Sequence, residues 1–289
     1  MSGDLHCHTR LSDGSLGIED IITLAKKRGI ETLAITDHDC LAGTVRAKII
    51  GARQGIQVIV GVELSATHEA SNKNVHILCY SPDAPDMLEG LCKRNSLARK
   101  KAAHFMMLQT AKRFPITTEF IMKCSTGSTN LYKKHIMQAL IECGYADRFH
   151  GEMYKKLFTK DSPDSILVTP KYADTKEVID AIHEAGGIAI LAHPMLDGAF
   201  DIVDDLLSLG LDGIEVFHPS ANAEQQDELK KFATKKKILM TGGSDFHGLY
   251  NKYSVSLGDY STPDDCLRAL LSYKAKQKRL QKKLQQAAE

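Results

Sequence analysis

The chain has 289 residues, of which 43% are hydrophobic and 25% charged, a composition typical of a globular protein with a sizeable core. No apolar run approaches the roughly 20 residues that span a bilayer, so we expect no membrane segment. The N-terminus leads straight into His6 and His8, so we expect no signal peptide. The seven cysteines are odd in number and lack CxxC spacing, so they predict reduced thiols and a cytoplasmic location.

The formal net charge of +1 conceals an uneven distribution along the chain. Residues 91–165 contain 14 Lys and Arg against 6 Asp and Glu, and residues 264–289 contain 7 against 3. The rest of the chain, residues 1–90 and 166–263, therefore contains more acidic than basic residues. A basic appendage beside an acidic, metal-binding body favours a polyanionic substrate, although lysines on solvated helix faces would produce the same counts.

Short strands alternate with helices on both sides of a central helical segment. We predict strands over 3–8, 32–36, 57–63, 74–80, 187–192, 213–217 and 238–241. We predict helices over 18–28, 42–54, 175–185, 199–209, 222–235 and 266–289. This alternation is typical of parallel βα units. Residues 1–85 and 166–289 should therefore form one discontinuous barrel domain.

Between residues 86 and 165 the strand pattern gives way to helical periodicity. Helical patterns cover 87–114, 131–144 and 151–158. We interpret 86–165 as a helical insertion, and we expect this insertion to determine which substrate enters.

Most of the strand-like runs stop at a histidine or a carboxylate. The residues concerned are His6, His8, Asp13, Asp37, His38, Asp39, Glu63, His76, His193, His218, Asp245 and His247. Imidazole and carboxylate groups are ligands of Zn, Mn and Fe. Because the carboxyl ends of barrel strands share one face, this pattern predicts a multinuclear metal site. A lone buried histidine is more often a hydrogen-bonded core residue, and we keep that interpretation for His68, His104, His150 and His183.

The segments DLHCHTRLSDGS, ITDHD, GVELS, AHP and GGSDFHG resemble the successive motifs of the PHP (polymerase and histidinol phosphatase) family. More narrowly, they resemble its stand-alone metal-dependent phosphoesterases, which include nucleoside 3′,5′-bisphosphate phosphatases and a 5′→3′ exoribonuclease. The resemblance implies an α/β fold, a distorted (β/α)7 TIM-like barrel, with two to three divalent metal ions (Mn, Fe or Zn).

The resemblance also implies a role for each candidate residue. It assigns His6, His8, Glu63 and Asp245 to a first metal, Glu63, His76 and His193 to a second, and Asp13, His38 and His247 to a third. Asp37 and Asp39 would orient imidazoles, although Asp37 could itself be a ligand. A metal-bridging hydroxide would attack phosphorus, with His218 as general acid or phosphate-binding group.

Candidate substrate-binding residues lie in the insertion. Arg99 resembles the family arginine that contacts a second phosphate, and Arg94 lies on the same predicted helix. Lys134 and His135 stand where relatives often have Arg-x-His or Arg-Pro-His. The insertion has few aromatic residues and the chain has no Trp, so a small phosphorylated substrate, in particular a nucleotide, is favoured over long nucleic acid.

We therefore predict a phosphomonoesterase that acts on nucleoside mono- or 3′,5′-bisphosphates. Histidinol phosphatase and 5′→3′ exonuclease activity on short RNA remain open alternatives. An amidohydrolase also opens with His-x-His but normally needs one or two metals, and a non-catalytic, metal-stabilised scaffold is the non-enzymatic alternative. We expect neither a membrane nor an obligate protein partner.

Overall fold

The computed structural model describes residues 3–196 and 198–288, with side chains described as far as residue 277. Seven strands form a single sheet in which sequence order is also spatial order. They are β1 (Gly3–Cys7), β2 (Thr32–Ile35), β3 (Gln57–His68), β4 (Lys73–Tyr80), β5 (Ile188–Leu191), β6 (Gly213–Phe217) and β7 (Leu239–Gly242).

The sheet closes on itself through its first and last strands. Cys7 bridges in parallel to Phe246, just beyond β7, and the backbone N–H of His8 donates to the carbonyl of Phe246 at 2.9 Å. The α/β class and the distorted seven-stranded barrel that we predicted are confirmed.

One strand departs from the parallel arrangement that we predicted. β4 runs antiparallel to both β3 and β5, whereas the other neighbouring strands pair in parallel. Only residues 69–72 separate β3 from β4, and so short a connection can make a hairpin but not a parallel crossover. As a result, His76 reaches the carboxyl-end face of the barrel from the first half of its strand, not from the end.

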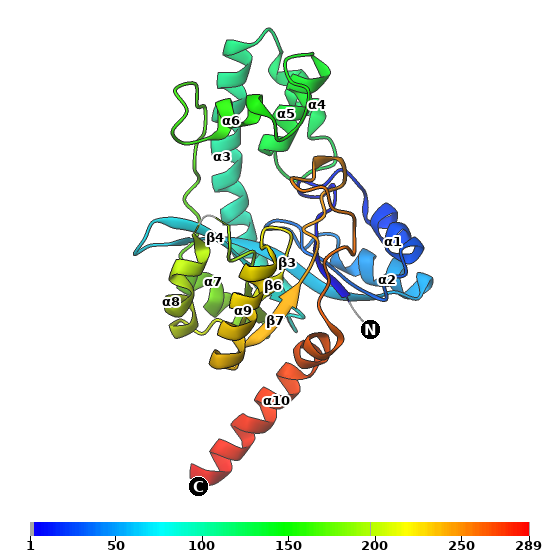
Figure 1. Cartoon of the computed structure of the whole chain (residues 1–289), viewed down its shortest axis with the longest axis vertical. Coiled ribbons are helices and arrows are strands. Elements are labelled where there is room, and N and C mark those ends of the chain that lie inside the picture. Colours follow the sequence, from blue (N-terminus) through cyan, green and yellow to red (C-terminus); the bar gives the residue numbers. More distant parts are fainter. Residues whose placement is uncertain (1–2, 197, 289) are drawn as a thin grey trace.

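Helices cover the outside of the barrel (Figure 1). They are α1 (Ile18–Lys27), α2 (Thr44–Gln54), α7 (Thr175–Glu184), η2 (Ala199–Ile202) with α8 (Val203–Ser208), and α9 (Ala223–Lys236). Their apolar faces pack on the strands, as where Ile21 and Ile22 of α1 contact the cluster around Leu33. The helix predicted over 199–209 is divided into a 3-10 turn and a short α-helix. The last helix, α10 (Asp264–Ala288), extends away from the body.

The predicted insertion forms a helical cap on the opposite side of the barrel from α10 (Figure 1). It consists of η1 (Pro85–Leu88), α3 (Glu89–Arg113), α4 (Thr118–Cys124), α5 (Lys133–Glu142) and α6 (Glu152–Phe158). The cap has an apolar core of its own, which includes Ile166 and is packed by Leu167 and Val168. In contrast, Leu91 and Cys92 at the start of α3 belong to the barrel core, so α3 joins the two parts. We had not predicted α4.

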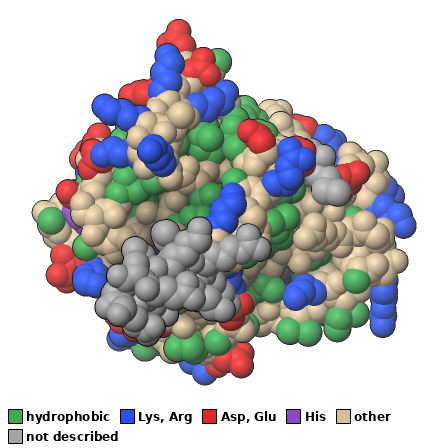
Figure 2. Space-filling view, turned by 90° about the horizontal axis from the view of Figure 1, so that it is seen from below, with side chains coloured by type: hydrophobic (Ala, Val, Ile, Leu, Met, Phe, Trp, Pro, Cys, Tyr) green, Lys and Arg blue, Asp and Glu red, His purple; other side chains and the backbone are tan. Residues whose placement is uncertain are grey.

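Charged side chains are mixed on the face seen from the α10 side. Figure 2 shows Lys and Arg side chains scattered among acidic and apolar ones on this face, without a continuous basic strip. Among the described residues, no helix combines the length and the hydropathy that a bilayer span requires.

The start of the 243–247 segment packs tightly against β1. A Cβ atom added to Gly243 would lie 2.4 Å from the backbone nitrogen of His6 and 2.5 Å from its Cβ. The absence of a side chain here allows β1 and β7 to close the barrel with His6 at the seam.

Replacing Gly243 with Ala should therefore push the His6 backbone out of place. We expect the free energy of unfolding to fall by about 1–3 kcal/mol, as for overpacked cores, and metal affinity to fall with it, measured by thermal denaturation and metal titration. Gly90→Ala is the matched control, because a Cβ on exposed Gly90 of α3 meets nothing within 4 Å. Wild-type melting and metal binding in Gly243→Ala would contradict this account.

Candidate metal centre and substrate pocket

Glu63 of β3 lies at the centre of the site. Its carboxylate is 1% exposed and is surrounded by imidazole nitrogens from five histidines. Oε1 faces Nδ1 of His76 at 2.9 Å and Nε2 of His193 at 3.0 Å, and Oε2 faces Nδ1 of His38 at 2.9 Å, Nε2 of His8 at 3.3 Å and Nε2 of His6 at 3.5 Å. Each oxygen therefore faces a different set of nitrogens, which is the geometry that a carboxylate bridging two cations requires.

His6 and His8 project from one face of β1 toward a shared carboxylate oxygen. Oδ1 of Asp245 lies 3.6 Å from Nε2 of His6 and 3.3 Å from Nε2 of His8. With Glu63, these side chains supply two nitrogens and two carboxylates to one small space. The four residues that we predicted for the first metal are thus brought together.

A second group lies around Oδ1 of Asp13. This atom is 3.1 Å from Nε2 of His247, 3.7 Å from Nε2 of His38 and 3.8 Å from Nδ1 of His8. One ligand atom from each of these four residues lies within 4.8 Å of the others. The three residues that we predicted for a third metal are therefore adjacent, and His8 lies between this group and the first.

The sequence analysis missed Glu215, a buried carboxylate on β6. Its oxygens accept the Nδ1 proton of His6 at 3.0 and 3.1 Å, and Oε2 also accepts the backbone N–H of His193 at 2.9 Å. Holding the proton on Nδ1 leaves the Nε2 lone pair of His6 free for a metal. The only signal for this role was a glutamate inside the apolar run GIEVF, where an unpaired carboxylate would be costly.

His218 differs from the other site histidines in the state of its two nitrogens. Its Nδ1 accepts the backbone N–H of Ser220 at 3.0 Å, so in the neutral imidazole the proton is on Nε2. Nε2 is buried, has no hydrogen-bond acceptor and lies 3.5 Å from Oδ2 of Asp245. A protonated Nε2 can donate a hydrogen bond but cannot bind a metal, which favours our interpretation of His218 as an acid or phosphate-binding group.

The chemistry of these donors fits divalent cations. Seven buried polar atoms facing the centre lack a hydrogen-bond partner: Nε2 of His6, His8, His218 and His247, Nδ1 of His38, Oδ1 of Asp13 and Oε2 of Glu63. Buried polar groups are nearly always partnered in folded proteins, so such a convergent set indicates a missing ligand. Except for His218, all of these atoms are good metal donors.

The protonation states of the carboxylates and of His38 suit metal binding, whereas those of His6 and His8 oppose it. Burial opposes ionisation of Glu63, Asp13 and Asp245, but the facing imidazoles outweigh it and hold each pKa well below its usual range, with the Lys134 ammonium also contributing at Asp13. Burial lowers the pKa of His38 to about 4, so its imidazole is neutral near pH 7. Burial also disfavours the charged form of His6 and His8, but the facing carboxylates outweigh it and raise the pKa of both, so a metal would bind there in competition with protons.

Three residues of the site have a left-handed backbone. Asp39, His193 and Asp245 have φ values of 48°, 30° and 50°. Such conformations cost a non-glycine residue about 1–3 kcal/mol and occur mainly where function requires them. The sharp backbone turns after β2, β5 and β7 direct these side chains toward the site. Asp245 and His247, two residues apart, both face the site, with Oδ1 of Asp245 3.5 Å from Nδ1 of His247.

The two aspartates that we expected to orient imidazoles make other contacts. Asp37 accepts the N–H and the hydroxyl of Thr9 at 2.8 and 2.6 Å and the hydroxyl of Ser12 at 2.5 Å. Asp39 accepts the N–H and hydroxyl of Ser65 and also binds Arg99. Asp39 therefore fixes the cap arginine, and Asp37 supports the loop that carries Asp13.

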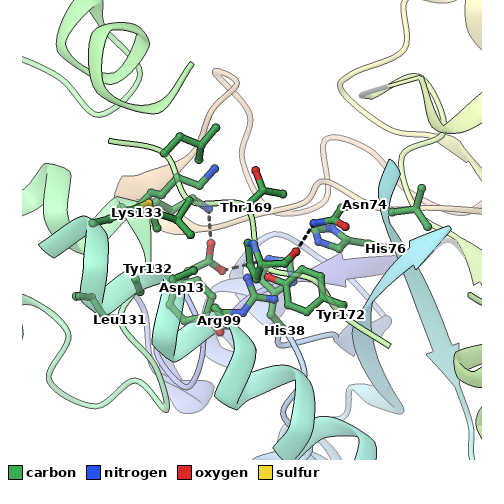
Figure 3. Close-up of a pocket in the computed structure, with 18 of the residues that line it drawn as sticks. Asp13, His38, Asn74, His76, Arg99, Leu131, Tyr132, Lys133, Thr169 and Tyr172 are labelled. Atoms are coloured by element: carbon green, nitrogen blue, oxygen red, sulfur yellow. Dashed lines mark hydrogen bonds and ion pairs between the residues drawn. The ribbon is translucent and has the colours of Figure 1, made fainter. Parts of the chain in front are cut away.

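Two of the four predicted substrate-binding residues line a pocket beside the metal-binding residues. Arg99 is held between the rings of Tyr132 and Tyr172, 5.0 and 5.2 Å from their centroids, and donates to Asp39 at 2.8 Å (Figure 3). Lys134 lies with its Nζ 2.9 Å from Oδ2 of Asp13. Both cations are therefore positioned where a bound anion would meet them.

The other two lie outside the pocket lining. Arg94 is exposed and forms an ion pair with Glu177 of α7. His135 is buried in α5, where its Nδ1 accepts the backbone N–H of Tyr132 and caps the helix. The structure does not bring these two residues to the pocket, because helical spacing alone does not show which side of α3 or α5 faces the barrel.

The pocket lies between the cap and the barrel and has a volume of about 360 Å³. Its lining combines the polar residues Asp13, His38, His76, His193, Arg99 and Lys134 with the apolar residues Ala103, Met106, Leu131, Leu167, Val168 and Leu196. Figure 3 shows Asp13, His38 and Arg99 side by side on one wall.

Buried imidazoles and carboxylates gathered at the carboxyl end of a barrel define a metal-dependent hydrolase. The PHP domain family matches residues 4–190. A phosphoribosyl 1,2-cyclic phosphate 1,2-diphosphodiesterase from Eggerthella lenta is 33% identical over 87% of this chain and 96% of its own. A 5′-3′ exoribonuclease from Haemophilus influenzae is 29% identical (84% and 89%), and a 3′,5′-nucleoside bisphosphate phosphatase from Chromobacterium violaceum 28% (84% and 86%).

A solved structure from Bifidobacterium adolescentis, assigned as a metal-dependent phosphoesterase, superposes with a TM-score of 0.84. It is 29% identical and covers 93% of this chain and 95% of its own. The chain therefore belongs to the PHP family. It is a metal-dependent phosphoesterase, a hydrolase that acts on phosphate esters.

Glu215→Gln should weaken metal binding without leaving a cavity in the core. The amide keeps the shape of the side chain but loses the charge that holds the Nδ1 proton of His6, so we expect metal affinity to fall about 10- to 100-fold. Equilibrium dialysis followed by elemental analysis measures this, with Glu228→Gln on the exposed face of α9 as control. Equal affinities for both variants would exclude the orienting role of Glu215.

His135 should make the protein less stable in mild acid. Burial lowers its pKa from 6.5 to about 4, so below pH 6.5 the unfolded chain binds a proton that the folded chain does not. Stability is therefore complete above 6.5 and falls as the pH drops toward 4, by on the order of 3 kcal/mol from this residue.

His135→Gln should flatten that pH dependence, because glutamine can keep the capping hydrogen bond to Tyr132 but does not titrate. Urea denaturation at several pH values between 7 and 4.5 gives the comparison. Parallel curves for the variant and the wild type would show that His135 does not contribute.

Proposed function

We propose that the protein hydrolyses phosphate monoesters of small nucleotides, with nucleoside mono- or 3′,5′-bisphosphates as substrates. The mixed lining of the pocket carries this proposal: candidate metal ligands and the cations Arg99 and Lys134 share it with apolar side chains. A phosphate would bind the charged groups and a nucleobase the apolar ones. The volume of about 360 Å³ is that of a small-molecule site.

The metal assignments made from the sequence are part of the proposal. His6, His8, Glu63 and Asp245 would hold one cation, Glu63, His76 and His193 a second, and Asp13, His38 and His247 a third, with Mn, Fe and Zn all compatible with these donors. Bound cations of this kind lower the pKa of water and neutralise phosphate oxygens.

The protein's own groups would act on the two sides of the ester. The Nε2 proton of His218 is placed to pass to the leaving oxygen or to bind a phosphate oxygen. Arg99, held by Asp39 and two tyrosines, would bind a second anionic group, and Lys134, held by Asp13, would contact a phosphate beside Asp13. Because both side chains are already fixed, little conformational entropy is lost when the substrate binds.

A second candidate substrate is a phosphoribosyl cyclic phosphate, favoured by the relative from Eggerthella lenta. Such a compound would use the charged groups of the pocket but would leave its apolar side chains without a base to contact. Stepwise hydrolysis of short RNA from its 5′ end is favoured by the exoribonuclease relative. The lining residues argue against long RNA, whose bases stack on aromatic side chains. Among the described tyrosines of the lining, Tyr132 and Tyr172 already flank Arg99, which leaves Tyr154 for stacking.

A phosphate-release panel tests the proposal. Metal-loaded protein should act on nucleoside 3′,5′-bisphosphates and monophosphates with kcat/KM roughly tenfold or more above that for ribose 5-phosphate, because the base buries apolar area that the sugar lacks. The panel also contains a phosphoribosyl cyclic phosphate, histidinol phosphate and a 5′-phosphorylated RNA of about five nucleotides.

Glu63→Gln should abolish activity on every compound, while Glu228→Gln should behave as wild type. Phosphate release from histidinol phosphate or from the cyclic ester, with none from any nucleotide, would overturn the nucleotide proposal. Release of mononucleotides from the RNA at a higher kcat/KM than phosphate from bisphosphates would replace it with the exonuclease.

A further inference from the structure

Asp13 is shared between metal-binding imidazoles and a lysine of the cap. Its Oδ1 has no hydrogen-bond partner and faces His247, His38 and His8. Its Oδ2 lies 2.9 Å from Nζ of Lys134, which is 16% exposed. The two oxygens of one buried carboxylate therefore face different groups, the imidazoles on one side and the Lys134 ammonium on the other.

The charges available to the two metal-binding groups are unequal. Two carboxylates, Glu63 and Asp245, face the nitrogens of His6 and His8. The group of His8, Asp13, His38 and His247 contains one carboxylate, although Glu63 and Asp245 of the neighbouring group also face its imidazoles. Since Lys134 already offsets the charge of Asp13, a divalent cation placed there would add two positive charges that the group does not balance.

We infer that Lys134 makes the Asp13 group a weak, phosphate-dependent cation site, whereas the Glu63 groups hold their cations in the free enzyme. A phosphate anion would supply the missing negative charge, and Lys134 lies where it could contact the same anion. The cation at Asp13 would then bind together with substrate and leave with product. This inference rests on the proposed metal assignment but not on which phosphate ester is the substrate.

Lys134→Met tests the inference through metal binding, without an activity assay. Metal-free protein is dialysed against a series of Mn concentrations, and bound Mn per chain is measured with and without inorganic phosphate. Wild type should bind two equivalents tightly and a third only weakly unless phosphate is present. In Lys134→Met the third equivalent should bind roughly tenfold or more tightly without phosphate, because the repulsion between the ammonium group and the cation is gone.

Two matched variants test whether the tighter binding of the third Mn comes from Lys134 itself or from the total positive charge of the pocket. Lys134→Arg keeps the positive charge and should retain the weak third site, and Lys133→Met removes the adjacent lysine of α5, which lines the same pocket, and should also resemble wild type. Three equally tight equivalents in wild type, or the same gain in Lys133→Met, would overturn the inference. Loss of all Mn binding in wild type would instead refute the metal assignment of the proposed function.

Discussion

A single desolvated carboxylate determines how the site is built. Glu63 is buried in the barrel and carries a charge whose removal from water costs several kcal/mol unless opposite charge surrounds it. Five imidazoles from β1, β2, β4 and β5 and the turns that follow them converge on its two oxygens. Imidazole and carboxylate groups gathered in this way are metal ligands, so the position of Glu63 in the barrel favours a metal centre.

The groups behind the ligands explain why the ligands point inward. Glu215 fixes the proton of His6, and the backbone carbonyl of Asp245 accepts the Nδ1 proton of His247 at 2.8 Å. The left-handed backbone at His193 and Asp245 is part of the same support, since these turns carry strain that the closed barrel maintains. The cap contacts the barrel through Asp39, whose carboxylate accepts a hydrogen bond from Arg99. This bond connects the loop after β2, which also carries His38, to the pocket.

Several features were visible in the sequence because they depend on local pattern. The strand-end histidines and carboxylates predicted the metal-binding residues, and the loss of strand periodicity predicted the cap. Features that depend on which side of a helix or strand faces the site could not be predicted from local pattern. Glu215 looked like one residue of an apolar strand. Arg94 was predicted together with Arg99, but five helical positions turn Arg94 toward Glu177 and leave Arg99 in the pocket.

The sequence by itself determined the chemistry of this protein: a barrel whose strand ends carry His, Asp and Glu in the order of the PHP motifs, and hence a phosphoesterase. These residues are specified by type and spacing, which a linear chain records directly. Only the tertiary structure decided how charge is shared among them, with Glu63 between two sets of nitrogens and Asp13 between imidazoles and Lys134. That distribution depends on distances of about 3 Å between segments far apart in the chain, and sequence spacing does not determine such distances.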